Sequence, residues 1–253
     1  MRGTVTPTAQ RTGTGRISVP AVTTFALIHG GGYTGSCWDR VVPHLSGDVI
    51  VVELPGRGRR PADLGEVTLA DNVAATIEDL GDTDDVVMVA HSVGGITAAH
   101  VLNEARDRIR HVVLVSATIP PHASAVIDHI DPDVRASVME GSGGGVFRID
   151  DATCREILCN DLDDEQSAWA LTGRVDETTS ILAEPVDLTA IRSDVVPVTY
   201  IRLLQDHTLP LEQQDAAIEA LGSPEVIDLD SGHMAMISRP EQLAAILNDL
   251  AAR

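Results

Sequence analysis

Ser92 lies in a short segment that has the pattern of a catalytic nucleophile. The segment Ala-His-Ser-Val-Gly-Gly at 90–95 follows an apolar, strand-like run and precedes an amphipathic stretch. A sharp strand-to-helix turn with small residues around it lifts a serine hydroxyl clear of a sheet and places it at a helix N-terminus. The simpler alternative is a serine that only caps the helix. We interpret Ser92 as the nucleophile.

A serine hydroxyl needs a general base, and the base needs a group that holds its ring. His233 lies in the loop between the last predicted strand and the last predicted helix, and Asp206 opens the loop after the preceding strand. The order Ser92, Asp206, His233 is the chain order of a triad built on a nucleophile turn of this kind. Asp228 and Asp230 are alternatives, but they lie too close to His233 in sequence to reach its ring.

A glycine-rich loop after the first predicted strand offers backbone N–H groups. His29 is followed by Gly30, Gly31 and Gly32, so no side chain obstructs these amides. Attack on a carbonyl requires two donors aimed at the developing oxyanion. We predict that Gly31 N–H and Val93 N–H form this oxyanion hole.

The same loop also fits a rival interpretation. Residues 30–35 match the pattern G-x-G-x-x-G, and Glu53 ends the next predicted strand, where an acid could bind a ribose. A Rossmann NAD(P)-dependent oxidoreductase is therefore an alternative. It leaves Ser92, Asp206 and His233 without a role and needs a cofactor, whereas the serine mechanism needs neither a cofactor nor a metal.

Composition excludes several further classes of function. The chain has no lysine, which removes Schiff-base chemistry and the phosphate-binding lysine of a P-loop. A net charge of −20 argues against nucleic acid and anionic membranes as partners. No apolar run is long enough to span a bilayer. The three cysteines, Cys37, Cys154 and Cys159, form no metal or disulfide pattern, so we expect packing roles and a reducing, cytoplasmic setting.

Short apolar runs alternate with longer amphipathic segments, the pattern of a mostly parallel, doubly wound sheet with helices on both faces. The predicted strands are 24–28, 49–53, 86–90, 111–116, 196–203 and 225–229, and the predicted helices are 36–45, 69–80, 93–105, 210–221 and 239–252. From 118 to 194 this rhythm is lost. Helix-like pieces appear at 152–159 and 165–172, with a glycine-rich break at 141–145.

We therefore predict one domain over 23–253, after a loose N-terminal leader at 1–22. Its core is formed by 23–117 and 195–253, and a helical cap, residues 118–194, is inserted after the strand at 111–116. We call residues 118–194 the cap segment. The sequence leaves the oligomeric state open.

With these features, the chain resembles the α/β-hydrolase superfamily, and within it the group of plant methylesterases, hydroxynitrile lyases and related bacterial esterases. The similar stretches are HGGGYTGSCWDRVVPHL at 29–45, ELPGRG at 53–58, AHSVGG at 90–95, VLVSATIPP at 113–121, YIRLLQDHTLP at 200–210 and SGHMAMISRPEQLA at 231–244. The resemblance implies a cofactor-free serine esterase acting on a small-molecule carboxylic ester or lactone, with its pocket between sheet and cap.

Two other functions on the same fold stay open, a hydroxynitrile lyase and a ligand receptor that turns over slowly. In the lyases of the group that this chain resembles, a lysine directly follows the catalytic histidine and a threonine follows the histidine of the first loop. Those positions hold Met234 and Gly30, which favours an esterase. We expect Met234 and Trp169 to line the substrate pocket and Gly30 to leave room beside the oxyanion hole.

Overall fold

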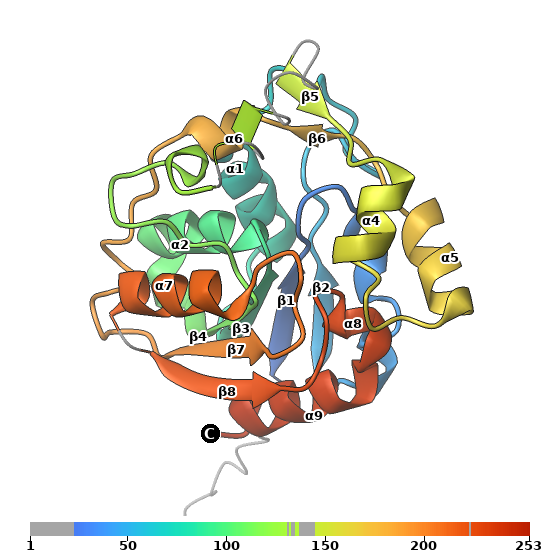
Figure 1. The fold of residues 1–253 in the computed structure, drawn as a ribbon. Coiled ribbons are helices and arrows are strands. Elements are labelled where there is room, and N and C mark those ends of the chain that lie inside the picture. The colour runs from blue at the N-terminus through green and yellow to red at the C-terminus, as the bar shows by residue number, and fades with distance from the viewer. Residues whose placement is uncertain (1–22, 131, 133–134, 137–144, 223) are drawn as a thin grey trace, which may run out of the picture.

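A six-stranded parallel sheet forms the centre of the molecule (Figure 1). The computed structural model describes residues 23–130, 132, 135–136, 145–222 and 224–253. The strand order is β2-β1-β3-β4-β7-β8, and every neighbouring pair is parallel. The strands are β1 (Thr24–Ile28), β2 (Asp48–Val51), β3 (Val86–His91), β4 (Ile109–Val115), β7 (Val198–Leu203) and β8 (Glu225–Leu229). The predicted parallel sheet is confirmed.

The inner strands are apolar on both faces because each face packs against helices. In β1, Ala26 and Ile28 join one core cluster, while Phe25 and Leu27 join the other, and all four are fully buried. Helices α1 (Leu69–Leu80), α2 (Gly94–Ala105) and α7 (Leu211–Leu221) lie on one face. Helices α8 (Ala235–Ser238) and α9 (Pro240–Ala251) lie on the other (Figure 1).

Local sequence signals set the ends of these helices. Thr68 and Asp71 form a capping box at the start of α1, in which each side chain accepts from the other's backbone N–H. Gly222 follows the end of α7 with a φ of 89°, a conformation that glycine adopts without a steric cost.

The predicted helix at 36–45 is wrong. That stretch forms two 3₁₀ helices instead, η1 (Gly35–Trp38) and η2 (Val42–His44). Pro43 explains the break, because proline lacks the N–H that an α-helix needs and disfavours the α conformation at the residue before it. A further 3₁₀ helix, η3 (Arg106–Arg108), joins α2 to β4.

The cap segment is less regular than the core. Its described elements are η4 (Val126–Asp128), β5 (Val146–Phe147), α4 (Asp151–Ile157), α5 (Asp164–Thr172), β6 (Glu177–Thr178) and α6 (Ser180–Ala183). Helices α4 and α5 occupy the two predicted helical pieces, whereas the antiparallel pair β5 and β6 was not predicted. The leader at 1–22 and all but Gly145 of the break at 141–145 lie outside the described residues. The division into core and cap stays a prediction.

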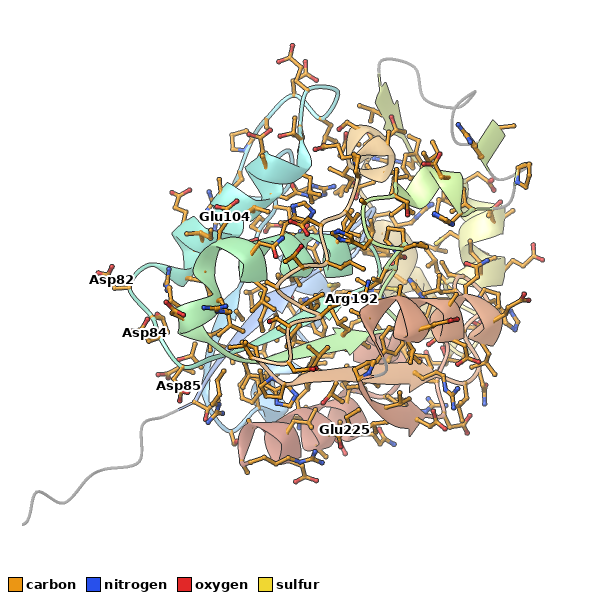
Figure 2. All side chains as sticks on the ribbon, turned by 90° about the vertical axis from the view of Figure 1, so that its left-hand side faces the viewer. Asp82, Asp84, Asp85, Glu104, Arg192 and Glu225 are labelled. Carbon is orange, nitrogen blue, oxygen red and sulfur yellow. The ribbon has the colours of Figure 1, made fainter. Side chains whose placement is uncertain are left out.

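Exposed acids gather where the strands begin. Asp82, Asp84 and Asp85 precede β3 and Glu225 starts β8, and the first three side chains lie at the outline of the molecule in Figure 2. Among the described residues, no helix has the length and apolar character to cross a membrane.

Candidate active site

Ser92 occupies a strained turn between β3 and α2. Its φ is 52°, a left-handed conformation that non-glycine residues rarely adopt and that costs about 1–3 kcal/mol. Small neighbours make the turn possible. A Cβ on Gly94 would lie 2.6 Å from the carbonyl oxygen of His29, and a Cβ on Gly95 would lie 2.7 Å from Cβ of Ala117. The surrounding packing therefore holds Ser92 in place against the strain.

Ser92, His233 and Asp206 form one hydrogen-bonded chain. His233 Nδ1 lies 2.6 Å from Asp206 Oδ2, and His233 Nε2 lies 3.1 Å from Ser92 Oγ. The carboxylate only accepts, so Nδ1 carries the proton and the Nε2 lone pair faces the serine hydroxyl. His233 is 2% exposed and Asp206 6%, so water does not compete for these bonds.

Asp206 is held by four hydrogen bonds in all. Ser116 Oγ donates to Oδ2 at 2.7 Å, and the backbone N–H groups of Thr208 and Leu209 donate to Oδ1 at 2.7 and 2.8 Å. Burial alone would raise the pKa of Asp206. The charge of His233 and these hydrogen bonds outweigh that effect, so its pKa lies below the usual value.

The rival acids lie elsewhere. Asp228 binds the guanidinium of Arg202, and Asp230 accepts from the side-chain amide of Gln205.

The oxyanion-hole candidates, Gly31 N–H and Val93 N–H, donate to no protein acceptor within the described part of the chain. His29 Nδ1 lies 2.8 Å from the carbonyl oxygen of Gly30, which can only accept. The peptide bonds are trans, so Gly31 N–H points opposite to that carbonyl. His29 thus sets the direction of the donor. Burial, reinforced by the charge of Arg57, lowers the pKa of His29 to about 3 and keeps it neutral.

His91, which the sequence analysis did not assign, packs directly on His233. The ring centroids are 4.6 Å apart, and His91 Nε2 donates to the backbone carbonyl of His233 at 3.0 Å. Burial and the neighbouring charge of His233 lower the pKa of His91 to about 3. His91 therefore supports His233 without adding a second positive charge. The sequence signal that could have identified His91 as part of the site is its position directly before Ser92.

Two cavities open onto Ser92. One, of about 160 Å³, is also lined by Gly31 and His233, and the other, of about 310 Å³, extends toward the start of the cap segment. Both share Leu182 and Thr208. Apolar side chains dominate the two walls: Tyr33, Phe147, Ile149, Leu158 and Val175 in the first, and Ile119, Pro120, Pro121, Val126, Ile130 and Leu209 in the second.

The charged groups in the smaller cavity all have partners. Arg148 pairs with Asp176 and Arg174 with Asp151. The third group, Glu177, pairs with Arg57. Among the described wall residues of this cavity, none of the arginine or acidic side chains therefore offers a free charge to an ionic substrate.

Three expectations about the pocket need correction. Met234 is 1% exposed and packs in the core, and Trp169 packs against the same cluster, so neither is among the described residues that line the two cavities at Ser92. Gly30 leaves no room, because a Cβ there would lie 2.9 Å from both His91 Nδ1 and Ser92 Cβ. Its small size serves the packing of the nucleophile turn.

The glycine pattern at 30–35 also has a packing role. A Cβ on Gly35 would lie 2.5 Å from Val51 Cγ1, and Gly35 N–H donates to the carboxylate of Glu53 at 3.0 Å. The loop leads into η1, not into a long helix that could receive a pyrophosphate. The sheet order also differs from the Rossmann order. Within the described residues, no His, Cys, Asp or Glu group is arranged to hold a metal ion.

Comparison with known proteins gives a family match over most of the chain. Residues 25–246 match the model described as the alpha/beta hydrolase family. Methylesterase 7 of Arabidopsis thaliana is 28% identical over 90% of this chain and 95% of its own length. Putative methylesterase 13, chloroplastic, from the same plant is 23% identical over 89% of this chain, which spans 55% of that longer protein.

Solved structures show the same fold. An extracellular alpha/beta-hydrolase from a Paenibacillus species, which shares structural and functional homology with tobacco Salicylic Acid Binding Protein 2, superposes with a TM-score of 0.83. It is 23% identical to this chain and covers 90% of it and 98% of its own length. The predicted fold class is thereby confirmed.

Proposed function

We propose that this chain, which belongs to the alpha/beta hydrolase family, is a carboxylic ester hydrolase that cleaves small neutral esters by a serine mechanism at Ser92. One observation carries the proposal. Ser92, His233 and Asp206 are joined by continuous hydrogen bonds, and the N–H groups of Gly31 and Val93, which have no acceptor among the described residues, lie in the same site. Two mostly apolar cavities open onto Ser92.

In the first half of the reaction, Ser92 Oγ bonds to the carbonyl carbon of the ester while its proton moves to His233 Nε2. The carbonyl electron pair moves to the oxygen, and the N–H groups of Gly31 and Val93 stabilise the resulting oxyanion. Asp206 stabilises the imidazolium through Nδ1. When the carbonyl re-forms, the bond to the alcohol oxygen breaks and the alcohol leaves with the proton from Nε2.

In the second half, His233 takes a proton from water as the water oxygen attacks the acyl-enzyme. The same two amides stabilise the second oxyanion. Its collapse releases the acid and returns the proton to Ser92 Oγ. Every step uses groups of this chain, so the proposed reaction requires no cofactor and no metal.

The cavities support a substrate that is apolar on both sides of the ester bond. The acid and alcohol portions of a bound ester lie on opposite sides of the attacked carbon, and the two cavities meet at Ser92. The wall charges in the smaller cavity are already paired, so a neutral ester fits better than an ionic one. The chain also has no lysine to stabilise departing cyanide, which favours hydrolysis over cyanohydrin cleavage.

The test is turnover of small aryl and alkyl esters, combined with active-site labelling. A serine-directed phosphonate should add to Ser92, as located by peptide mass spectrometry. Ser92→Ala should fold, lose the label and lose about 10⁴- to 10⁶-fold in kcat.

Mandelonitrile and acetone cyanohydrin should release no significant cyanide. Efficient cyanide release with negligible ester cleavage would favour the lyase. A single turnover accompanied by a ligand-dependent rise in Tm would favour the receptor. Full activity in a folded Ser92→Ala protein would overturn the mechanism.

A further inference from the structure

A buried ion pair joins the cap segment to the loop between β2 and α1. Glu177, in β6, binds the guanidinium of Arg57, which lies in the loop between β2 and α1. The side chains are 4% and 1% exposed. A buried ion pair gives little net stability compared with apolar residues of the same size, so its presence calls for another role.

The Glu177 carboxylate reaches the glycine-rich loop at 29–32, which we call the oxyanion loop because it carries the proposed donor Gly31 N–H. Gly32 N–H donates to Glu177 Oε2 at 2.9 Å, and Gly32 O accepts from Val175 N–H at 2.8 Å. Both backbone polar groups of Gly32 are thus bound by the cap segment. A Cβ built on Gly31 would lie 3.2 Å from the same Oε2, so the carboxylate packs against the proposed donor residue itself.

Arg57 and Thr178 bind the second oxygen of this carboxylate. Thr178 N–H donates to Glu177 Oε1 at 2.8 Å, and Arg57 Nη2 donates to it as well. A second nitrogen of Arg57 donates to the carbonyl of Pro55 at 2.8 Å, which fixes the guanidinium in its own loop. Three separate parts of the chain therefore meet at one carboxylate.

The charge of this carboxylate matters because of where it lies. Glu177 lines the cavity that contains Ser92 and His233, close to where a negative oxyanion would form. An unpaired carboxylate would oppose that charge strongly in a site shielded from water. The guanidinium of Arg57 cancels the charge while leaving Oε2 free to hold Gly32.

We propose that Glu177, neutralised by Arg57, is a positioning residue that holds the oxyanion loop from the cap segment. In this proposal the Gly31 N–H, whose direction His29 sets through the carbonyl of Gly30, stays correctly placed only while β6 is docked on Gly32. This inference rests on the proposed ester hydrolysis at Ser92 and adds a requirement to it, that the cap segment completes the oxyanion hole.

The experiment compares kcat, KM and pH dependence in Arg57→Met, Glu177→Gln and the double variant. Arg57→Met leaves a bare carboxylate, so kcat should fall about 10²-fold at nearly unchanged KM, the size expected for a damaged oxyanion hole. Glu177→Gln keeps an acceptor for Gly32 N–H and should lose less than about tenfold in kcat. The double variant should recover toward Glu177→Gln, because the unpaired charge is gone.

A pH profile separates this role from a purely structural one. The ratio of Arg57→Met activity to wild-type activity should fall as pH rises, because a buried, unpaired carboxyl group ionises as protons become scarce. The double variant should show no such trend. Arg59→Met is the matched control. Arg59 lies two positions after Arg57 in the sequence and pairs with Asp79 at the surface. The kcat of Arg59→Met should match the wild type.

Each outcome separates this inference from the proposed function. An inactive wild-type protein contradicts ester hydrolysis itself. An active wild type with Arg57→Met unchanged in kcat, or with a double variant no better than Arg57→Met, overturns the positioning role. If Arg57→Met does not fold, Glu177→Ala replaces it. That variant loses the bond to Gly32 and should fall about 10²-fold in kcat, and a kcat equal to that of Glu177→Gln would overturn the proposal.

Discussion

The carboxyl edge of the sheet and the cap segment contribute differently to the candidate site. At the sheet edge, Ser92, Asp206 and His233 stand on loops that leave β3, β7 and β8, and short hydrogen bonds hold them. The cap segment contributes mainly cavity walls, from elements of two to nine residues. We therefore expect changes at the sheet edge to lower kcat, whereas changes to cap residues that only line the cavities, unlike Glu177, should mainly alter which ester is preferred.

The largest loss of kcat in this comparison is expected when the acid at the sheet edge is changed. Asp206→Asn should leave the fold intact, but an amide can donate to Nδ1 and so favours the wrong imidazole tautomer. We expect kcat to fall by up to about 10⁴-fold, measured by steady-state ester hydrolysis. The control is Asp230→Asn, which changes an acid on a nearby loop whose side-chain partner among the described residues is Gln205. If Asp230→Asn lost more activity than Asp206→Asn, the assignment of the acid would be wrong.

The sheet edge was readable from sequence because parallel strands bring their carboxyl ends to one side. Once the strands at 86–90, 196–203 and 225–229 are recognised as parallel strands of one sheet, the loops carrying Ser92, Asp206 and His233 must lie at the same edge of that sheet. Two of the six strands, β1 and β8, match their predicted ends fully. The failed helix at 36–45 shows the limit of this approach, since its apolar spacing was helical but Pro43 does not permit the backbone bonds.

The supporting contacts were not readable because they join distant parts of the chain. Ser116 lies 90 residues from Asp206, and Arg57 lies 120 residues from Glu177. Nothing local in either segment marks such a partner. The expectations for Met234 and Trp169 failed for a related reason, since neither a position next to His233 nor a place in the cap segment says whether a side chain faces a cavity or the core.

The sheet edge should also make stability depend on pH. His29 and His91 each have a folded pKa of about 3, below the unfolded value of 6.5. Below about pH 6.5 the unfolded chain therefore binds protons that the folded protein refuses, and the free energy of unfolding should fall as pH decreases. Each histidine contributes at most about 1.4 kcal/mol per pH unit in this window. The pKa of Asp206 is lowered in the folded protein, so its stabilising effect is lost only when the pH falls below the usual pKa of an aspartate.

Urea unfolding at a series of pH values between about 7 and 4.5 measures this slope. His91→Gln keeps a donor for the carbonyl of His233 and should reduce the slope by at most about 1.4 kcal/mol per pH unit. His44→Gln, at an exposed position, is the control and should leave it unchanged. An unaltered slope in His91→Gln would contradict the claim that a buried neutral His91 controls acid sensitivity.

The smallest expected effect tests the cap side of the comparison. Leu182, in α6, is partly buried and lines both cavities, so its side chain lies where the two portions of an ester would meet Ser92. Leu182→Ala should enlarge both cavities and change the relative kcat/KM for esters with a bulky acid and esters with a bulky alcohol. The change should be about tenfold, since a few methylene groups in an apolar pocket discriminate by about 1–3 kcal/mol. Leu171→Ala is the matched control, because Leu171 is a partly buried leucine of the same cap segment that lines neither cavity. Both variants should lose stability, but only Leu182→Ala should change the preference, and kcat for a small activated ester should stay within a few fold in each. An equal shift in the two variants would mean that loosening of the cap, and not the wall at Leu182, selects the substrate.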